Sequence, residues 1–180
     1  MIHRLFIGIS PPDWLKSQLI ATMDGVEGAR WQNEKQLHLT LRFVGDVDTA
    51  LADRLAKALE EVCSGCPAFP LAMEGAGTFE KNNQAQMLWA GVSHSPELIA
   101  LQKRVEQICQ MVGLEADTRV FVPHITLARL NSSSGPVQPF LDRNADLSSE
   151  VYRVERIILY ESHLSQTGSI YKEVKHYPLL

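Results

Sequence analysis

The feature that most constrains the fold is a tetrapeptide that occurs twice. The sequence HLTL at residues 38–41 returns as HITL at residues 124–127, which is 86 residues later. Side chains alternate across a β-strand, so in each copy the histidine and the threonine share one face and the two aliphatic residues share the other. Each copy therefore predicts a strand with an apolar face in a core and a polar face outside it. The pair indicates two similar lobes, related by an approximate twofold axis, that each contribute one strand to a common cleft.

Hydrophobic periodicity elsewhere predicts the order β-α-β-α-β-β-α-β-β-β, with a further short helix near Pro139 to Leu141. The expected strands cover residues 5–9, 37–44, 69–79, 86–92, 122–128, 151–161 and 170–176. The expected helices cover residues 13–23, 49–62 and 95–112. Strands outnumber helices and fall into hairpins, which predicts an α+β fold with mainly antiparallel sheet. Because no low-complexity linker divides the chain, we expect a single domain over residues 1–180.

Composition narrows the class of protein. The net charge of −4 argues against a protein that coats itself with nucleic acid, since such binding rests on a strongly basic surface. It leaves room for a local basic cleft that receives one RNA end. No run of about 18 apolar residues is present, so we expect no membrane span. Three cysteines without a secretion signal point to a reducing compartment, and we expect the protein in the cytoplasm.

The repeated residues have a chemical use. Two imidazoles and two hydroxyls around one anion are the groups needed to hydrolyse a phosphodiester without a metal. One histidine must be neutral to accept a proton and the other charged to donate one, and imidazole offers both forms near neutral pH. The threonine hydroxyls and a nearby positive charge would stabilise the pentavalent oxyanion. We therefore expect His38, Thr40, His124 and Thr126 to be catalytic.

A structural role for the repeated residues is the alternative to a catalytic one. A single His-x-Thr in a strand is most often structural, but two copies in 180 residues favour function. A zinc site built on His38 and His124 would need further ligands, and the spacing offers none. Cys63 and Cys66 have a redox-like spacing but follow an expected helix rather than open one, so we interpret them as structural.

The paired motif resembles that of the 2H phosphoesterase superfamily, and more narrowly that of the bacterial and archaeal RNA 2′,3′-cyclic phosphodiesterases, also called 2′-5′ RNA ligases. The resemblance covers nearly the whole chain and includes the segments RLFIGISPP, HLTLRFVGDV, AGTFEKNNQAQMLWAGV, FVPHITLARL and LYESHLSQTGSIYKEV. It implies two similar lobes whose antiparallel sheets form a central cleft, with helices on the outside.

The resemblance also implies the reaction and the roles. RNA with a 2′,3′-cyclic phosphate end would be opened to a 2′-phosphate, with no metal and no cofactor. His38 would be the proton donor and His124 the proton acceptor, while Thr40 and Thr126 would bind phosphate oxygens. The reverse reaction, which makes a 2′-5′ bond, is associated with the family as well. Small cyclic nucleotides are further expected substrates, and we expect a monomer.

Six residues are weaker candidates for substrate binding. Strand parity predicts that Arg42 points the same way as His38, whereas Arg129 has the opposite parity to His124 and would have to reach around the strand end. Aromatic rings near the motifs could stack on a base, although core packing is the commoner role. The complete set is Arg42, Arg129, Phe6, Phe43, Phe121 and Tyr171.

Two other functions stay open at this point. The chain could be an esterase for a small cyclic phosphate, such as ADP-ribose 1″,2″-cyclic phosphate. It could also be a non-catalytic module that binds RNA 2′-phosphates, although both histidines are retained. The length of the binding groove would separate an RNA substrate from a small one.

Overall fold

The computed structural model describes residues 1–180, except for the side chain of Val62. An eight-stranded antiparallel sheet runs in the order β10-β9-β1-β3-β7-β6-β5, with β2 added beside β7, and a separate two-stranded sheet pairs β4 with β8. The strands are β1 (Ile2–Ile9), β2 (Arg30–Trp31), β3 (Leu39–Asp48), β4 (Phe69–Leu71), β5 (Met73–Lys81), β6 (Gln84–Val92), β7 (His124–Arg129), β8 (Tyr152–Val154), β9 (Arg156–Ser165) and β10 (Gly168–Pro178). The helices are α1 (Asp13–Ile20), α2 (Thr49–Cys63), α3 (Pro96–Met111) and α4 (Gln138–Arg143).

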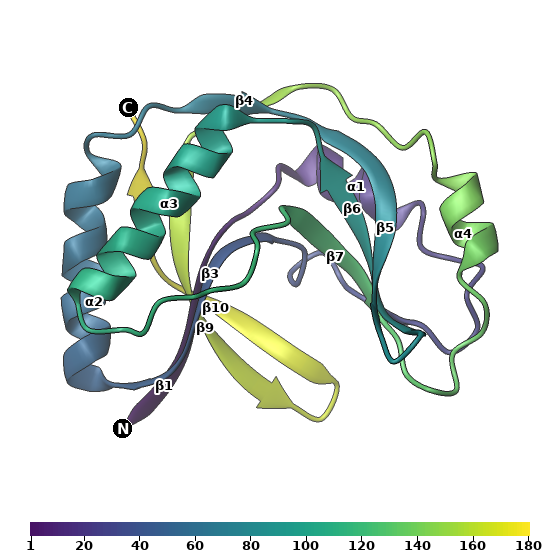
Figure 1. Cartoon of the computed structure of the whole chain (residues 1–180), viewed down its shortest axis with the longest axis horizontal. Coiled ribbons are helices and arrows are strands. Elements are labelled where there is room, and N and C mark those ends of the chain that lie inside the picture. The colour runs from purple at the N-terminus through teal and green to yellow at the C-terminus, as the bar shows by residue number, and fades with distance from the viewer.

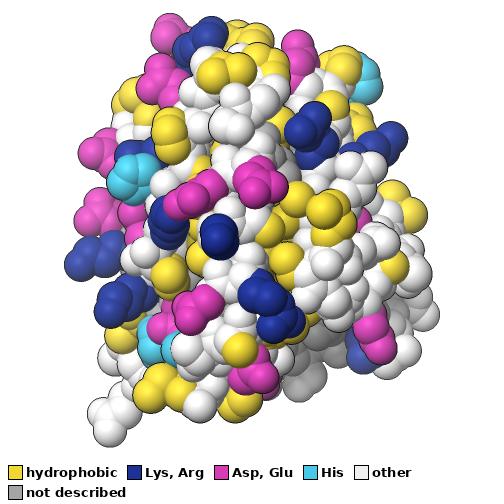
Figure 2. Space-filling view, turned by 90° about the vertical axis from the view of Figure 1, so that its left-hand side faces the viewer, with side chains coloured by type: hydrophobic (Ala, Val, Ile, Leu, Met, Phe, Trp, Pro, Cys, Tyr) yellow, Lys and Arg dark blue, Asp and Glu magenta, His cyan; other side chains and the backbone are white. Residues whose placement is uncertain are grey.

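The helices lie on the outside of two halves that enclose a concave face (Figure 1). Figure 1 shows α2 and α3 covering the half that contains β1, β3, β9 and β10, while α1 and α4 flank the half built from β5, β6 and β7. The predicted α+β fold with antiparallel strands and outer helices is confirmed. On the face that carries α2 and α3, acidic and basic side chains are interspersed (Figure 2).

Local signals in the sequence account for several elements. The hydroxyl of Ser95 accepts a hydrogen bond from the backbone N–H of Leu98 at 3.1 Å and caps α3, with Pro96 in the first turn. The turn between β5 and β6 is made by Asn82 and Asn83, whose φ angles are 55° and 60°. Asparagine tolerates this left-handed conformation, which two-residue hairpins require. The short helix expected near residue 139 is present as α4.

Other expectations were wrong in detail. The strands predicted at 69–79 and 151–161 each break once, and the short pieces before the breaks pair as β4 and β8. The break marks a change of partner: Ala72 accepts from the backbone N–H of Ser93 and Glu155 accepts from that of Leu179, which extends the β5–β6 and β9–β10 pairings by one residue, whereas the residues before them pair β4 with β8. Helix α1 ends at Ile20 rather than at residue 23, and its N-cap is Pro12.

The two halves meet at one strand pair. β3 and β7 are antiparallel and share a single register pair, Leu39 with Ile125. These are equivalent positions of the repeat, so the local twofold axis passes between them. Both side chains are buried in the core. On either side of this pair the strands separate, β3 to pair with β1 and β7 to pair with β6.

Each motif strand also has a register shift at the same position of the repeat. In β3, Gly8 pairs with Thr40 and Ile7 with Arg42, which leaves Leu41 extra. In β7, Trp89 pairs with Thr126 and Leu88 with Ala128, which leaves Leu127 extra. An extra residue of this kind is a β-bulge, and it reverses which face the following side chains occupy. The two lobes therefore repeat the bulge as well as the motif.

The bulge in β3 leaves no room for a side chain at Gly8. A Cβ added there would lie 2.7 Å from the carbonyl oxygen of Leu39. We expect Gly8→Ala to lower the free energy of unfolding by about 1–3 kcal/mol, because the strand backbone must shift to relieve the contact. Urea denaturation measures this change, and an unaltered midpoint would contradict it.

Candidate active site

The four motif side chains lie together in the cleft between the two halves. His38, Thr40, His124 and Thr126 line a cavity of about 510 Å³. This arrangement follows from the Leu39–Ile125 pair. Continuing its antiparallel register across the joint sets His38 opposite Thr126, and Thr40 opposite His124. Each imidazole thus has one threonine on its own strand and another on the facing strand.

The ring of His38 is held from both ends. Its Nδ1 lies 2.7 Å from the carbonyl oxygen of Gln36, and its Nε2 lies 2.9 Å from Oγ1 of Thr40. A carbonyl can only accept, so Nδ1 carries the proton and Nε2 of the neutral ring is an acceptor. The ring also contacts Phe6 at 4.7 Å between centroids and meets the ring of Tyr171 edge-on at 5.1 Å. These contacts fix Nε2 in the cleft.

His124 is held in the same way in the other lobe. Its Nδ1 lies 2.6 Å from the carbonyl oxygen of Val122, which again assigns the proton to Nδ1 and leaves Nε2 to the cleft. The ring of Phe79 meets it edge-on at 4.9 Å, and that of Trp89 lies 6.1 Å away. Gly77 makes room for Trp89, since a Cβ at residue 77 would lie 2.3 Å from the indole ring.

Burial and positive charge keep both imidazoles neutral. Burial comes first among the causes that lower the pKa of His38 to about 4, followed by the charges of Arg129 and His124, while the hydrogen bond to Gln36 opposes them. Burial and the charge of Arg129 also lower the pKa of His124, against the hydrogen bond to Val122. The free site at neutral pH therefore presents two Nε2 lone pairs together with the guanidinium of Arg129.

The two arginines that follow the motifs lie in different surroundings. Arg129 lies in the cleft wall, exposed, although its parity in an unbroken strand would turn it away. Arg42 is 7% exposed, and its side chain turns toward α3. The prediction that Arg42 points the same way as His38 was wrong, because the bulge at Leu41 reverses the parity of the residues after it. The equivalent bulge turns Arg129 into the cleft.

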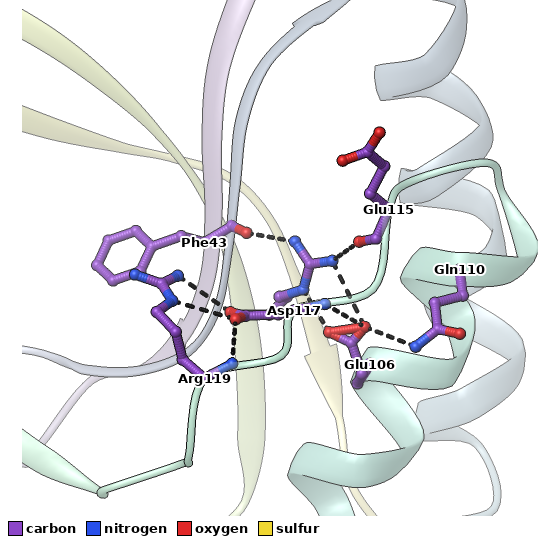
Figure 3. Close-up of polar contacts among 7 residues, drawn as sticks. Phe43, Glu106, Gln110, Glu115, Asp117 and Arg119 are labelled. Atoms are coloured by element: carbon purple, nitrogen blue, oxygen red, sulfur yellow. Dashed lines mark hydrogen bonds and ion pairs between the residues drawn. The ribbon is translucent and has the colours of Figure 1, made fainter.

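The guanidinium of Arg42 is held by protein groups, and Figure 3 labels its partners Glu106, Glu115 and Phe43. It donates to both carboxylate oxygens of Glu106 on α3 and to the backbone carbonyls of Phe43 and Glu115. Burial alone would raise the pKa of Glu106, but hydrogen bonds from Arg42 and Gln110 outweigh it and lower that pKa. A buried guanidinium with these partners serves the packing of α3 and the following loop, rather than a ligand.

The predicted aromatic residues divide between two neighbouring spaces. Phe6, Phe43 and Tyr171 line the central cavity, whereas Phe121 lines an adjoining pocket of about 240 Å³. Phe43 is 51% exposed, which is unusual for a phenylalanine in a strand, and it lines both spaces. The ring of Phe6 is buried and packs against the ring of His38, which agrees with core packing as the commoner role of such a ring.

Several residues that line the cleft were not predicted from the sequence. Phe79, Met87 and Arg119 line the cavity, and the Thr126 hydroxyl lies 3.2 Å from the sulfur of Met87. Phe79 and Met87 belong to neighbouring strands, and only the sheet register brings them to the motif. Arg119 lies five residues before His124, and this closeness in sequence was the one signal that could have drawn attention to it.

Comparison with known proteins identifies the family. A family model described as the 2′-5′ RNA ligase superfamily matches residues 11–165. The chain belongs to this superfamily. The resemblance read from the paired motif is thereby confirmed.

Curated relatives carry a consistent description. The RNA 2′,3′-cyclic phosphodiesterase of Thermotoga maritima is 29% identical over 94% of this chain and 91% of its own length. That of Geobacillus stearothermophilus is 34% identical over 83% of this chain, which spans about half the length of that relative. Among solved structures, Escherichia coli LigT complexed with 3′-AMP is 26% identical, covers 99% of both chains and has a TM-score of 0.79.

The described residues form neither a metal cluster nor a reactive pair of thiols. Among the residues whose side chains are described, no group of three His, Cys, Asp or Glu could hold a metal ion. Cys63 and Cys66 are buried free thiols, and burial raises the pKa of Cys63 to about 12, which is the reverse of a reactive thiol. Within the part of the chain that the structure describes, no helix is long and apolar enough to cross a bilayer.

The charge of Arg129 makes a testable contribution to both imidazoles. In the free protein we expect His38 to titrate near pH 4 and His124 below its ordinary value of about 6.5. Arg129→Gln removes a positive charge that disfavours both imidazolium forms, so both pKa values should rise. Histidine Cε1 chemical shifts recorded against pH would measure this, with Arg153→Gln, an exposed arginine on β8, as the control. Unmoved pKa values in Arg129→Gln would contradict the assignment.

Proposed function

We propose that this chain hydrolyses the 2′,3′-cyclic phosphate at the 3′ end of RNA to a 2′-phosphate, by acid–base catalysis on His38 and His124 without a metal. The observation that carries the proposal is the matched pair of imidazoles. Each is fixed through Nδ1 by the carbonyl two residues earlier, and each offers Nε2 to the same cavity. Oriented imidazoles are the groups that general acid–base catalysis requires.

Each lobe contributes one histidine to the proposed reaction. Water attacks the phosphorus while Nε2 of His124 takes one of its protons, so that a new P–O bond forms. The bond from phosphorus to O3′ breaks, and Nε2 of His38 gives its proton to the departing oxygen. Thr40, Thr126 and Arg129 would stabilise the negative charge on the pentavalent phosphorus. The proton gained by His124 returns to solvent and His38 is reprotonated, which closes the cycle.

The assignment of His38 as the acid comes from the resemblance to the family, because the pKa values of the free site do not choose between the two rings. His124, with its lowered pKa, is neutral at pH 7 and ready to accept a proton. His38 must be charged to donate, and burial opposes this in the free site. A bound phosphate adds negative charge beside the ring and raises its pKa. The Thr40 hydroxyl, which contacts Nε2 in the free site, is then released to donate to a phosphate oxygen.

The relatives support the reaction class. Their curated names describe RNA 2′,3′-cyclic phosphodiesterases, and LigT has been crystallised with 3′-AMP. If a 5′-hydroxyl took the place of water in the same step, the product would be a 2′-5′ bond. We keep this ligation as a secondary activity of the same site.

The length of the groove favours RNA over a small cyclic phosphate. The central cavity shares Arg129 and Tyr171 with a pocket of about 200 Å³ at one end, and Phe43 and His124 with the 240 Å³ pocket at the other. The groove is therefore longer than a lone cyclic phosphate requires, which suits the further nucleotides of an RNA end. An esterase for ADP-ribose 1″,2″-cyclic phosphate and a non-catalytic 2′-phosphate binder are therefore the weaker alternatives.

The test is hydrolysis of a short RNA with a 2′,3′-cyclic phosphate end, in excess EDTA, followed by phosphorus NMR. We expect a 2′-phosphate product. His38→Ala and His124→Ala should each lower kcat by about 10²–10⁴-fold, the usual contribution of one acid or base. His94→Ala, which alters an exposed histidine outside the cleft, is the matched control.

Each outcome bears on a separate part of the proposal. Near-normal turnover in either cleft variant, with the fold intact by circular dichroism, would contradict the two-histidine mechanism. Activity that EDTA abolishes would contradict metal independence. A 3′-phosphate product would mean that O2′ departs, and the bound orientation would have to be reversed.

A further inference from the structure

Arg119 occupies a distinctive place at the edge of the cleft. It lies on the loop between α3 and β7, and it lines both the central cavity and the adjoining 240 Å³ pocket. Its side chain is 71% exposed, so it faces solvent and any ligand that lies in the groove. Arg119 takes no part in the proposed proton transfers or in the contacts to the pentavalent phosphorus.

The position of Arg119 differs from that of Arg129. Arg129 lines the central cavity and the 200 Å³ pocket at one end of the groove. Arg119 lines the central cavity and the 240 Å³ pocket at the other end. The two guanidinium groups therefore face different stretches of the groove. A cation in this position suits a second anionic group, displaced from the first along the groove.

The guanidinium of Arg119 is held in advance of binding (Figure 3). Its Nε and Nη2 donate to the two carboxylate oxygens of Asp117 at 3.1 and 3.0 Å, and its backbone N–H donates to the same carboxylate. The backbone N–H of Asp117 in turn donates to Glu106, which is the partner of buried Arg42. The loop is thus tied to β3 and α3, and a pre-positioned group loses less entropy on binding.

This arrangement leaves one edge of the guanidinium available. Asp117 occupies Nε and Nη2, while Nη1 has no partner among the described residues. Guanidinium N–H groups bind phosphate oxygens through charge-assisted hydrogen bonds. Beside it, Phe43, Phe79 and Phe121 line the pocket, and Phe43 exposes half of its surface. Aromatic faces of this kind stack nucleobases.

We infer that Arg119 and the pocket beside it form a subsite for the phosphodiester and base immediately upstream of the cyclic phosphate. The inference rests on the proposed function and makes it more specific: the enzyme recognises a polynucleotide end in preference to a free cyclic nucleotide. The upstream linkages are the other anionic groups along an RNA chain, so they are the partners that a second, separate cation would meet.

The opposite end of the groove is less suited to this task. The 200 Å³ pocket there contains Arg30 and Trp31. Arg30 forms no ion pair or side-chain hydrogen bond with the described residues, so nothing orients its guanidinium as Asp117 orients that of Arg119. We therefore assign the upstream strand to the Arg119 end.

Three substrates test the assignment: adenosine 2′,3′-cyclic phosphate, the dinucleotide ApA with a 2′,3′-cyclic phosphate, and the same dinucleotide with an uncharged methylphosphonate at its internal linkage. In the wild-type protein, kcat/KM should be highest for the charged dinucleotide. Arg119→Gln should lower kcat/KM on that substrate by about 10- to 100-fold more than on the mononucleotide, the size of one charge-assisted hydrogen bond, and mainly through KM. It should also make the two dinucleotides equivalent.

Two further variants sharpen the comparison. Arg104→Gln changes an exposed arginine of α3 that lies outside the cleft, and it should keep the wild-type preference for the charged dinucleotide. Arg30→Gln tests the other end of the groove. If Arg30→Gln, rather than Arg119→Gln, removed the preference, the upstream strand would lie at that end and the assignment would be overturned.

The remaining outcomes separate this subsite from the proposed function. Equal losses on all three substrates in Arg119→Gln would overturn the subsite and leave the hydrolysis intact. A wild-type protein that prefers neither dinucleotide over the mononucleotide would overturn it as well. Absence of hydrolysis of every substrate by the folded wild-type protein would instead overturn the proposed function.

Discussion

The pairing of Leu39 with Ile125 is the constraint on which the rest of the site depends. It is the single register pair between β3 and β7, and it joins two equivalent positions of the repeat. Because strand side chains alternate, burying these two aliphatic residues in one core presents the histidines and threonines of both strands on the opposite face. Beyond this pair the strands separate toward their own partners. The same contact therefore joins the lobes, brings the imidazoles together and leaves the cleft open between them.

The repeated bulge then determines which residues accompany the motifs. Arg42 stands four residues after His38, whereas Arg129 stands five residues after His124. In an unbroken strand the first would face the cleft and the second the core. The extra residues Leu41 and Leu127 reverse this, so Arg42 anchors α3 through Glu106 while Arg129 enters the cleft. A difference of one position in sequence thus separates an arginine that anchors a helix from one that lines the cleft.

Local patterns in the sequence were sufficient for the elements and for the four motif residues. The helix expected over residues 95–112 and the two alternating tetrapeptides depend on signals a few residues apart, and both appear in the structure. The Ser95 cap and the turn at Asn82 and Asn83 are local in the same way. The bulges could not be predicted, because register is a property of two strands and is set by β1 and β6. The same reason hid Phe79 and Met87, which reach the motifs across neighbouring strands. Prediction from the sequence was reliable where the cause was local.

The aromatic surroundings of His38 explain why a buried imidazole suits this site. Contact with Phe6, Tyr160 and Tyr171 removes water from the ring and disfavours its charged form. Arg129 adds repulsion in the free site, and in the proposed reaction the same guanidinium would attract the anionic substrate. A phosphate in the cleft would neutralise that repulsion, and the low-dielectric surroundings would strengthen its attraction to the imidazolium. In the proposed reaction, protonation of His38 would therefore be linked to occupancy of the cleft, so that the acid would form when a leaving oxygen is present to receive its proton.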